Sequence, residues 1–407
     1  MLNQETINII KSTVPVLEVH GEAITTRFYQ LLFANHPELL NIFNHANQKQ
    51  GRQQRALAGA VYAAAAYIDN LEAIMPVVVQ IANKHRSLGI MPEHYPLVGQ
   101  NLIAAIKDVL GDAATDEIID AWTKAYGVIA DAFISVEADM YREAEEQPGG
   151  WEGFRRFIVA NKVKESDLIT SFYLKPEDGK RIASYQAGQY ISVKIEKKVN
   201  DDYTHIRQYS LSDAPGKDYY RISVKREPEN GDKPEGVVSN YLHRTVQEGD
   251  RLLISAPAGD FILDTDSDIP LVLISGGVGL TPMVSMAKTA ADLQPSRKVT
   301  FIHAAINGNL HAMGEQIKEL STANANVTSY FCYEKPTDED RQRNAFHKEG
   351  YIDLNWLKSI LPDNEADFYF CGPLPFMKAI NRALKAWGVP EQRIHFEFFG
   401  PKGSLDE

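Results

Sequence analysis

The segment Gly276-Gly277-Val278-Gly279-Leu280-Thr281 directly follows the apolar run Leu271 to Ser275. Glycines in this position let backbone N–H groups approach a pyrophosphate, and a helix start adds partial positive charge. Thr281 is suited to cap that helix and Pro282 to be its first residue. Pro282 also replaces the third glycine of a G-x-G-x-x-G fingerprint, and no ribose-binding acid is evident after Ala304. The loop predicts dinucleotide binding outside the standard dehydrogenase fold, and a tight turn without ligand is the alternative.

A second turn, Cys371-Gly372-Pro373, ends the apolar segment Phe368 to Cys371. Ligands of parallel sheets bind outside the carboxyl ends of the strands. Two such turns at one sheet edge favour a nucleotide site more strongly than either alone. Cys371 could also be a small buried apolar residue, the commoner role of a free cysteine.

Three further motifs precede the glycine loop in a β-rich region: Gly188-Gln189-Tyr190, Arg207-Gln208-Tyr209-Ser210-Leu211 and Gly236-Val237-Val238-Ser239-Asn240. With Gly-x-Gly-x-Thr-Pro and Cys-Gly-Pro, their order resembles ferredoxin-NADP-reductase-like flavoenzymes over about residues 151 to 401. The resemblance implies one FAD, with NADH or NADPH as electron donor. Singly, Tyr209 is more often a core residue and Arg207 a surface cation, so the order of the motifs carries the inference.

The implied flavin site draws on the second and third motifs. Tyr209 would stack on the isoalloxazine, Arg207 would neutralise a phosphate and Ser210 would hydrogen-bond a ring heteroatom. Val238 and Ser239, near a helix start, would hold the pyrophosphate.

The segment Glu397-Phe398-Phe399-Gly400-Pro401 follows a strand near the end of the sequence. By the same resemblance, Phe399 would lie against the flavin and Glu397 would tune its potential, with core packing as the alternative for both phenylalanines. No basic cluster after Val299 to Ala304 is placed to meet a 2′-phosphate, so NADH is favoured over NADPH. The implied cofactor-binding set is completed by Tyr190, Gln208, Gly276, Gly277, Val278, Gly279, Leu280, Thr281, Cys371, Gly372, Pro373, Phe398, Gly400 and Pro401.

In the N-terminal region, His85 has apolar neighbours at helical spacing and can face a flat apolar cavity. An ordinary core or surface histidine is the alternative. With Tyr29, Phe43 and Gln53 before it, His85 resembles the proximal histidine of a globin heme pocket over about residues 2 to 146. Because a reductase follows this globin-like region, the whole chain resembles the flavohemoglobin family, whose activity is nitric oxide dioxygenation.

This second resemblance implies a proximal and a distal side for one heme b. On the proximal side, His85 would be the iron ligand, and Tyr95 and Glu137 would form a relay that makes it more electron-donating. Lys84 would contact the cofactor and could form an ion pair with Glu137. Surface exposure is the alternative for Glu137.

On the distal side, Phe43 would pack on the porphyrin, and Tyr29 and Gln53 would face bound oxygen. The implied reaction passes electrons from NAD(P)H through FAD to heme iron, where bound oxygen converts nitric oxide to nitrate. Two rival functions stay open: a heme-dependent alkyl hydroperoxide or peroxide reductase, and an oxygen or nitric oxide sensor. The second is disfavoured because no kinase, cyclase or basic DNA-binding segment is visible after Glu146.

The elements that must position these residues define the expected fold. Helical spacing predicts an all-α domain over residues 1–146, which the resemblance identifies as a globin, and Gln147-Pro148-Gly149-Gly150 lies in a linker over 147–153. Short β-rich segments predict a β-barrel over 154–265, and alternating strands and helices predict an α/β parallel-sheet domain over 266–407. The resemblance to ferredoxin reductases implies that these are the FAD and NAD(P) domains.

Composition limits the partners of this 407-residue chain. Its formal charge of -12 argues against nucleic acid and anionic membranes, because both require a basic face. Two cysteines are too few for a four-cysteine iron-sulfur cluster. No secretory signal and no apolar run long enough for a membrane span are visible. We therefore expect a self-sufficient cytoplasmic monomer whose substrates are oxygen and nitric oxide.

Overall fold

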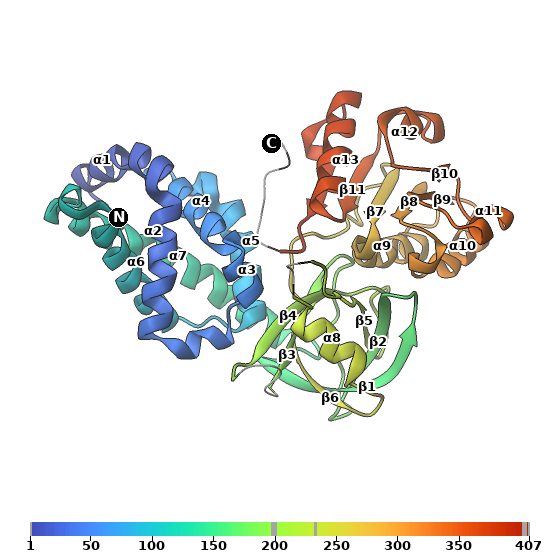
Figure 1. Ribbon diagram of the computed structural model, residues 1–407, viewed down its shortest axis with the longest axis horizontal. Helices are drawn as coiled ribbons and strands as arrows, with labels where there is room; N and C mark the ends of the chain where they lie inside the picture. Colours follow the sequence, from blue (N-terminus) through green and yellow to red (C-terminus); the bar gives the residue numbers. More distant parts are fainter. Residues whose placement is uncertain (1, 197–201, 232–233, 401–404, 406–407) are drawn as a thin grey trace. The chain divides into compact units, whose positions relative to one another are not determined.

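The computed structural model describes residues 2–196, 202–231, 234–400 and 405 (Figure 1). The chain divides into two compact units. The first comprises Met1–Gly153, Lys194–Arg207 and Gly400–Lys402, and the second comprises Phe154–Val193, Gln208–Phe399 and Gly403–Glu407. Pro401, one of the expected cofactor residues, lies outside the described residues. Among the described residues, no helix is long and apolar enough to cross a membrane.

Residues 2–146 of the first unit are helical. The Asn3 side chain accepts a hydrogen bond from Thr6 N at 2.8 Å and caps the first helix, while Gly89, at φ 79°, ends the helix that carries His85. The helices are α1 (Gln4–Ser12), α2 (Val14–Asn35), α3 (His45–Lys49), α4 (Arg52–Ala66), α5 (Met75–Leu88), α6 (His94–Leu110) and α7 (Asp116–Glu146), with 3-10 turns at Pro37–Asn41, Leu71–Ile74 and Gly111–Ala113. A buried apolar core that includes Phe28, Leu102 and Trp122 joins α1, α2, α4, α6 and α7.

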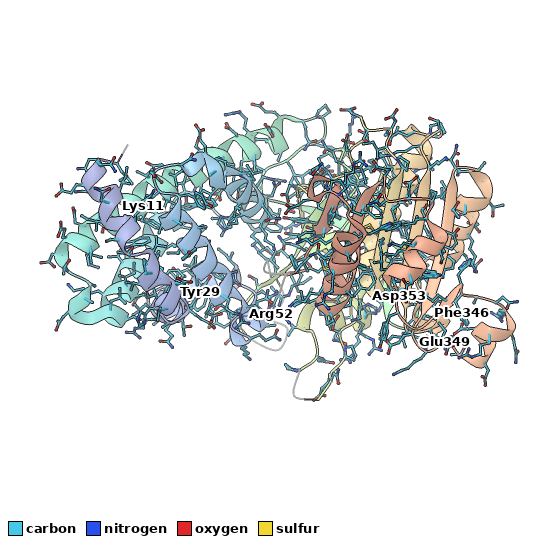
Figure 2. The ribbon with its side chains drawn as sticks, turned by 90° about the horizontal axis from the view of Figure 1, so that it is seen from above. Lys11, Tyr29, Arg52, Phe346, Glu349 and Asp353 are labelled. Carbon is cyan, nitrogen blue, oxygen red and sulfur yellow. The ribbon has the colours of Figure 1, made fainter. Side chains whose placement is uncertain are left out.

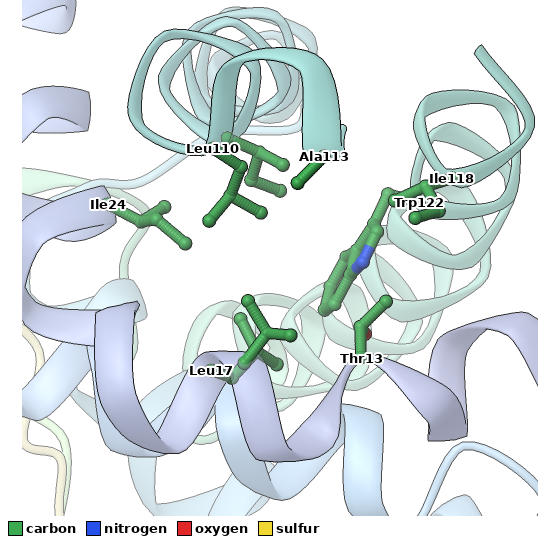
Figure 3. A pocket seen from close by; sticks show the side chains of 9 residues that line it. Thr13, Leu17, Ile24, Leu110, Ala113, Ile118 and Trp122 are labelled. Atoms are coloured by element: carbon green, nitrogen blue, oxygen red, sulfur yellow. The ribbon is translucent and has the colours of Figure 1, made fainter. Parts of the chain in front are cut away.

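A small cavity of about 50 Å³ lies in this core between α2, α6 and α7 (Figure 3). Its walls are almost wholly apolar, with Leu17, Leu110 and Trp122 around it, and the Thr13 hydroxyl donates to Ile10 O. None of the expected heme residues lines it. The cavity is therefore packing space separate from the His85 region.

A six-stranded sheet in the order β4-β3-β6-β1-β2-β5 follows the helices along the chain. A bridge between Leu211 and Ile222 joins the ends of this order, so the sheet closes on itself as a barrel. Helix α8 (Val237–Arg244) follows the fifth strand. The strands are β1 (Phe154–Lys164), β2 (Ile169–Pro176), β3 (Tyr190–Ile195), β4 (His205–Ser210), β5 (Tyr220–Lys225) and β6 (Arg251–Ser255).

A parallel sheet in the order β10-β9-β8-β7-β11-β12 follows the barrel. Side chains of β7 alternate: Leu271 and Leu273 face one core with α9 and α10, while Val272 and Ile274 face another with α12 and α13. The bounds are β7 (Leu271–Gly276), α9 (Leu280–Leu293), β8 (Val299–Ala305), α10 (Gly314–Ala323), β9 (Val327–Tyr333), α11 (Asp338–Gln342), β10 (Lys348–Glu349), α12 (Leu354–Ile360), β11 (Asp367–Cys371), α13 (Leu374–Trp387) and β12 (Ile394–Glu397), with short 3-10 turns at Gly277–Gly279, Gly308–Leu310 and Glu391–Arg393.

The start of α9 differs from the sequence prediction. The loop forms a 3-10 turn over Gly277–Gly279, and α9 begins at Leu280 with Gly279 as its N-cap. The Thr281 hydroxyl donates to Val278 O at 3.1 Å, so it does not cap the helix. The glycine turn leads directly into the helix, which starts without a side-chain cap hydrogen bond.

Candidate active site

The His85 imidazole on α5 is held by two groups from other helices. Its Nδ1 lies 2.7 Å from Glu137 Oε1 on α7 and 3.3 Å from the Tyr95 hydroxyl on α6. The Tyr95 hydroxyl in turn donates to the same Glu137 oxygen at 2.6 Å. Glu137 is 3% exposed, so this carboxylate is shielded from water. The structure thus brings together the three residues of the expected proximal relay.

Proton positions in this relay follow from the chemistry of the partners. Burial and the neighbouring Glu137 raise the pKa of Tyr95 well above its ordinary value, so its hydroxyl remains a donor. A neutral imidazole that donates its Nδ1–H to a carboxylate keeps its Nε2 lone pair for a metal. The donor set therefore suits a heme iron ligand.

Tyr95 is itself positioned by a contact that the sequence analysis did not identify. The Tyr126 hydroxyl donates to Tyr95 O at 2.7 Å. Tyr126 lies across Gly99, where an added Cβ would meet its ring at 2.5 Å. A glycine at position 99 therefore leaves the space in which Tyr126 supports the relay.

The expected distal residues Tyr29 and Phe43 also lie together. Tyr29, on α2 in the helical unit (Figure 2), is 6% exposed, and its ring centroid lies 5.7 Å from that of Phe43. Burial raises the pKa of Tyr29 far above its ordinary value, while the nearby amides of Gln48 and Gln53 oppose this shift. Tyr29 is therefore a protonated donor near the expected distal residue Gln53.

Gln48, which the sequence analysis did not single out, shows whether the distal side is suited to hold a bound ligand. Its Nε2 is buried without a hydrogen-bond partner among the described residues. Gln54 Nε2 donates to Gln48 Oε1 at 3.1 Å and so fixes this amide. A buried N–H without an acceptor is costly, and a bound ligand at a distal site could satisfy it. Together with the donor set at His85, this orphan amide fits a heme pocket.

Lys84 precedes the expected iron ligand on α5. Its ammonium donates to Gly400 O at 2.8 Å, within the first compact unit. Contact of Lys84 with the cofactor and an ion pair with Glu137 remain predictions.

The glycine loop and the Cys371 turn meet at the carboxyl edge of the parallel sheet. Cys371 pairs with Ser275 of β7 and with Glu397 of β12. A Cβ on Gly279 would lie 2.2 Å from Cys371 O, so the two turns are in close contact. Gly277, at φ 54°, has no atom within 4 Å of an added Cβ, among the residues that the structure describes. The backbone at Gly277 is therefore open to a ligand, while Gly279 is packed tightly against the Cys371 turn. An open glycine backbone at this sheet edge fits a bound nucleotide.

The expected flavin residues lie on β3, β4 and α8. Tyr190 N donates to Ala258 O at 2.9 Å and the Tyr190 ring packs on Gly259, so this tyrosine is fixed against the segment after β6. Arg207 and Tyr209 are partly exposed on β4, as is Gln208, and Ser210 is buried.

The helix α8 begins at the expected pyrophosphate-binding residues. Val238 and Ser239 are both buried in its first turn. The Ser239 hydroxyl accepts from Glu227 N and donates to Gly236 O, both at 3.2 Å. Its side chain is therefore committed to the local turn, and the binding of a phosphate by this turn remains a prediction.

The two C-terminal phenylalanines differ in their surroundings. Phe398 packs on the core beneath α12 and α13, with its ring centroid 5.6 Å from that of Phe396. Phe399 is 46% exposed and presents a face that a flavin could cover. Glu397 is partly buried beside Cys371. Burial of the Cys371 thiol raises its pKa, and the nearby charge of Glu397 raises it further. Cys371 is therefore a buried thiol and not a thiolate.

Curated relatives match this chain from end to end. A flavohemoprotein from Bacillus thuringiensis subspecies konkukian is 60% identical over 405 residues, covering 100% of both chains. The chain belongs to the flavohemoprotein family. A flavohemoprotein from Rhizobium meliloti is 50% identical over 98% of this chain and 99% of its own.

Family models divide this flavohemoprotein as its fold does. The globin model matches residues 26–133, the oxidoreductase FAD-binding domain residues 156–262 and the oxidoreductase NAD-binding domain residues 273–382. The predicted order of domains, an all-α globin, then a barrel FAD domain and a parallel-sheet NAD domain, is therefore confirmed.

Solved structures agree with this assignment. A Malassezia yamatoensis flavohemoglobin with bound FAD and heme is 29% identical, with a TM-score of 0.84 over 98% of this chain and 100% of its own. The FAD/NAD-binding domain of a nitric oxide dioxygenase from Vibrio cholerae is 40% identical, with a TM-score of 0.55 over 61% of this chain and 99% of its own. A flavohemoprotein with both a globin and a reductase in one chain is self-contained for electron transfer.

Proposed function

We propose that this flavohemoprotein is an NADH-dependent nitric oxide dioxygenase that carries one heme b and one FAD. The observation that carries the proposal is the buried Glu137 carboxylate bonded to His85 Nδ1, in a chain that also contains a flavin reductase. We further propose that it acts as a cytoplasmic monomer, on oxygen and nitric oxide. Sedimentation of the purified protein at micromolar concentration tests the monomer.

The bound heme and FAD would supply one-electron chemistry at iron and the conversion of a hydride pair into single electrons. His85 would hold the iron through Nε2, with Phe43 against the porphyrin. Glu137 accepts hydrogen bonds from both His85 and Tyr95, which fixes the imidazole tautomer and increases its basicity. This strongly donating ligand suits oxygen activation better than reversible oxygen storage.

On the distal side, Tyr29 holds its proton at neutral pH, because burial raises the pKa of its hydroxyl. That hydroxyl and the amides of Gln48 and Gln53 can donate hydrogen bonds to an oxygen ligand. Preorganised donors in a buried site stabilise developing negative charge. The pocket therefore favours an oxygen-derived group with anionic character.

In the reductase, the loop after β8 supports NADH over NADPH. Gly308 N donates to Asp340 Oδ2 at 3.1 Å, and Asp340 is 7% exposed. Burial alone would raise the pKa of Asp340, but hydrogen bonds from Thr337 and Gly308 outweigh it and lower the pKa. The carboxylate is therefore ionised, and its charge would repel a 2′-phosphate at this loop.

The activity can be tested with the purified protein loaded with heme and FAD. We expect NADH to accelerate the loss of nitric oxide in oxygenated buffer, with nitrate as the product. His85→Ala should abolish the effect, whereas His20→Ala, on an exposed stretch of α2, should leave it intact. Nitric oxide loss that NADH does not change, or loss without nitrate, would overturn the proposal.

A peroxide reductase is the second candidate, because the same Glu137–His85 contact increases electron donation to a ligand. NADH turnover should be compared with nitric oxide and with an alkyl hydroperoxide at equal concentration. A larger kcat/KM for the hydroperoxide would replace the dioxygenase assignment.

A further inference from the structure

A buried cluster of charged side chains connects the barrel to the parallel sheet within the second compact unit. Asp213 of the barrel pairs with Lys288 of α9, with 2.9 Å between Oδ1 and Nζ. Arg221 of β5 lies 3.8 Å from the other Asp213 oxygen. Asp213 is 6% exposed and Arg221 2%, so the cluster lies in the interior and not on the surface.

Three further hydrogen bonds connect the cluster with helices α9 and α10. The Ser285 hydroxyl of α9 donates to Asp213 O at 2.6 Å. Gln316 of α10 accepts from Arg221 Nη1 at 2.9 Å and from Lys288 Nζ at 3.3 Å. Helix α9 is therefore bound to the Asp213 loop of the barrel, and α10 is bound to the neighbouring strand β5 through Arg221.

The cluster joins the two segments that must face each other for flavin reduction. Asp213 comes three residues after Ser210, the last polar residue of the flavin motif on β4. Lys288 lies on α9, the helix that begins at the glycine loop. A shift of this contact would therefore move the nicotinamide loop relative to the flavin motif.

We propose that Asp213 is a positioning residue for hydride transfer, and that its contact with Lys288 sets the approach of nicotinamide to the flavin. The proposal rests on the reductase part of the proposed function. Asp213 is not placed to touch the reacting atoms. It acts through α9 and the glycine loop.

The charge states agree with this arrangement. Burial alone would raise the pKa of Asp213, but the charges of Arg221 and Lys288 outweigh burial and hold it below the usual range. Burial and the charge of Arg221 lower the pKa of Lys288, which Asp213 opposes. Both partners of the contact therefore depend on each other to remain charged inside the protein.

Anaerobic stopped-flow reduction of the bound FAD by NADH tests the proposal. Asp213→Asn preserves the shape of the side chain and removes its charge, and Lys288→Gln is a milder change on the partly exposed partner. We expect each to lower the limiting rate of flavin reduction about tenfold, with the Kd for NADH within twofold of the wild type. The long-wavelength charge-transfer absorbance of stacked nicotinamide and flavin should weaken in parallel.

The double variant Asp213→Asn/Lys288→Gln should resemble the single variants, because both changes break one contact. Asp218→Asn is a matched control, since Asp218 pairs with Lys175 at 2.7 Å within the barrel and both side chains are exposed. Lys288→Arg keeps the positive charge and should retain most of the wild-type rate of flavin reduction. Flavin content and Tm report whether each variant folds.

A wild-type rate and charge-transfer band in Lys288→Gln, with full flavin content, would overturn the proposal. So would a uniform loss of rate and NADH affinity with a lowered Tm, which indicates only a loosened structure. Failure of the wild type itself to reduce its flavin with NADH would instead refute the reductase function on which the proposal rests.

Discussion

Replacing Gly279 with alanine tests the contact between the two turns of the nucleotide site. The backbone at Gly279 has φ -61° and ψ -7°, which alanine adopts without strain. Its new Cβ would lie 2.2 Å from Cys371 O and 2.7 Å from Gly372 N, against 3.4 Å for an ordinary contact. The two turns would therefore have to move apart by about 1 Å, and a misplacement of that size can lower a reaction rate about 100-fold.

The limiting rate of FAD reduction by NADH, measured anaerobically, should accordingly fall by about two orders of magnitude in Gly279→Ala. Overpacking should also destabilise the protein by about 1–3 kcal/mol, seen as a lower Tm. Leu293→Ala, an exposed position at the end of the same helix, is the control. A Gly279→Ala protein that matches the wild type within twofold in rate, with an unchanged Tm, would show that the turns do not pack as described.

Three further changes probe other parts of the protein. Tyr29→Phe removes a distal hydrogen-bond donor worth about 1 kcal/mol or more, so nitric oxide turnover should fall several-fold with heme content unchanged. Turnover equal to that of the wild type would exclude a distal role for Tyr29. Glu137→Gln removes the charge beside His85, so the heme potential should rise and activity should fall about 10- to 100-fold, whereas an unchanged potential in a spectroelectrochemical titration would contradict the relay. Burial and Lys318 lower the pKa of His311 to about 4, and burial and His311 lower that of His303. Below about pH 6.5 these two histidines take up protons in the unfolded chain but not in the folded protein. As the pH is lowered from 6.5 to 4.5, the free energy of unfolding should therefore fall by about 1.4 kcal/mol per pH unit for each histidine. Calorimetry from pH 7.5 to pH 4.5 measures this loss, and a slope no shallower in His311→Gln would argue against it.

The fold was predictable where local pattern and final environment agree. The apolar run Leu271 to Ser275 lies in β7 (Leu271–Gly276) as expected, because a strand buried between helices reads as a continuous apolar segment. The start of α9 was expected at Pro282 with Thr281 as its cap, two residues after the observed start at Leu280. The glycine turn continues into the helix through 3-10 geometry, and sequence alone does not distinguish that geometry from a capped start.

The candidate site was predictable where the order of residues carries the information. Tyr29, Phe43 and His85 are separated along the chain, but a globin-like order places them in one pocket, and Tyr29 and Phe43 do lie together. The contribution of Gln48 was not predictable, because a glutamine in a short polar helix reads as a solvated residue. Its buried Nε2, which has no hydrogen-bond partner among the residues that the structure describes, becomes evident only when α3 is packed in place.

The Asp213–Lys288 contact shows why some functional geometry is invisible in sequence. The partners are 75 positions apart, and each reads as an ordinary surface charge. A buried ion pair of this kind adds little net stability, because desolvation of two charges offsets most of their attraction. An apolar pair of equal volume would hold the barrel and the sheet together at least as firmly, but would allow them to slide. Charged partners with fixed hydrogen-bond directions allow one arrangement, and that specificity, more than stability, accounts for a charged cluster between the flavin motif and the glycine-loop helix.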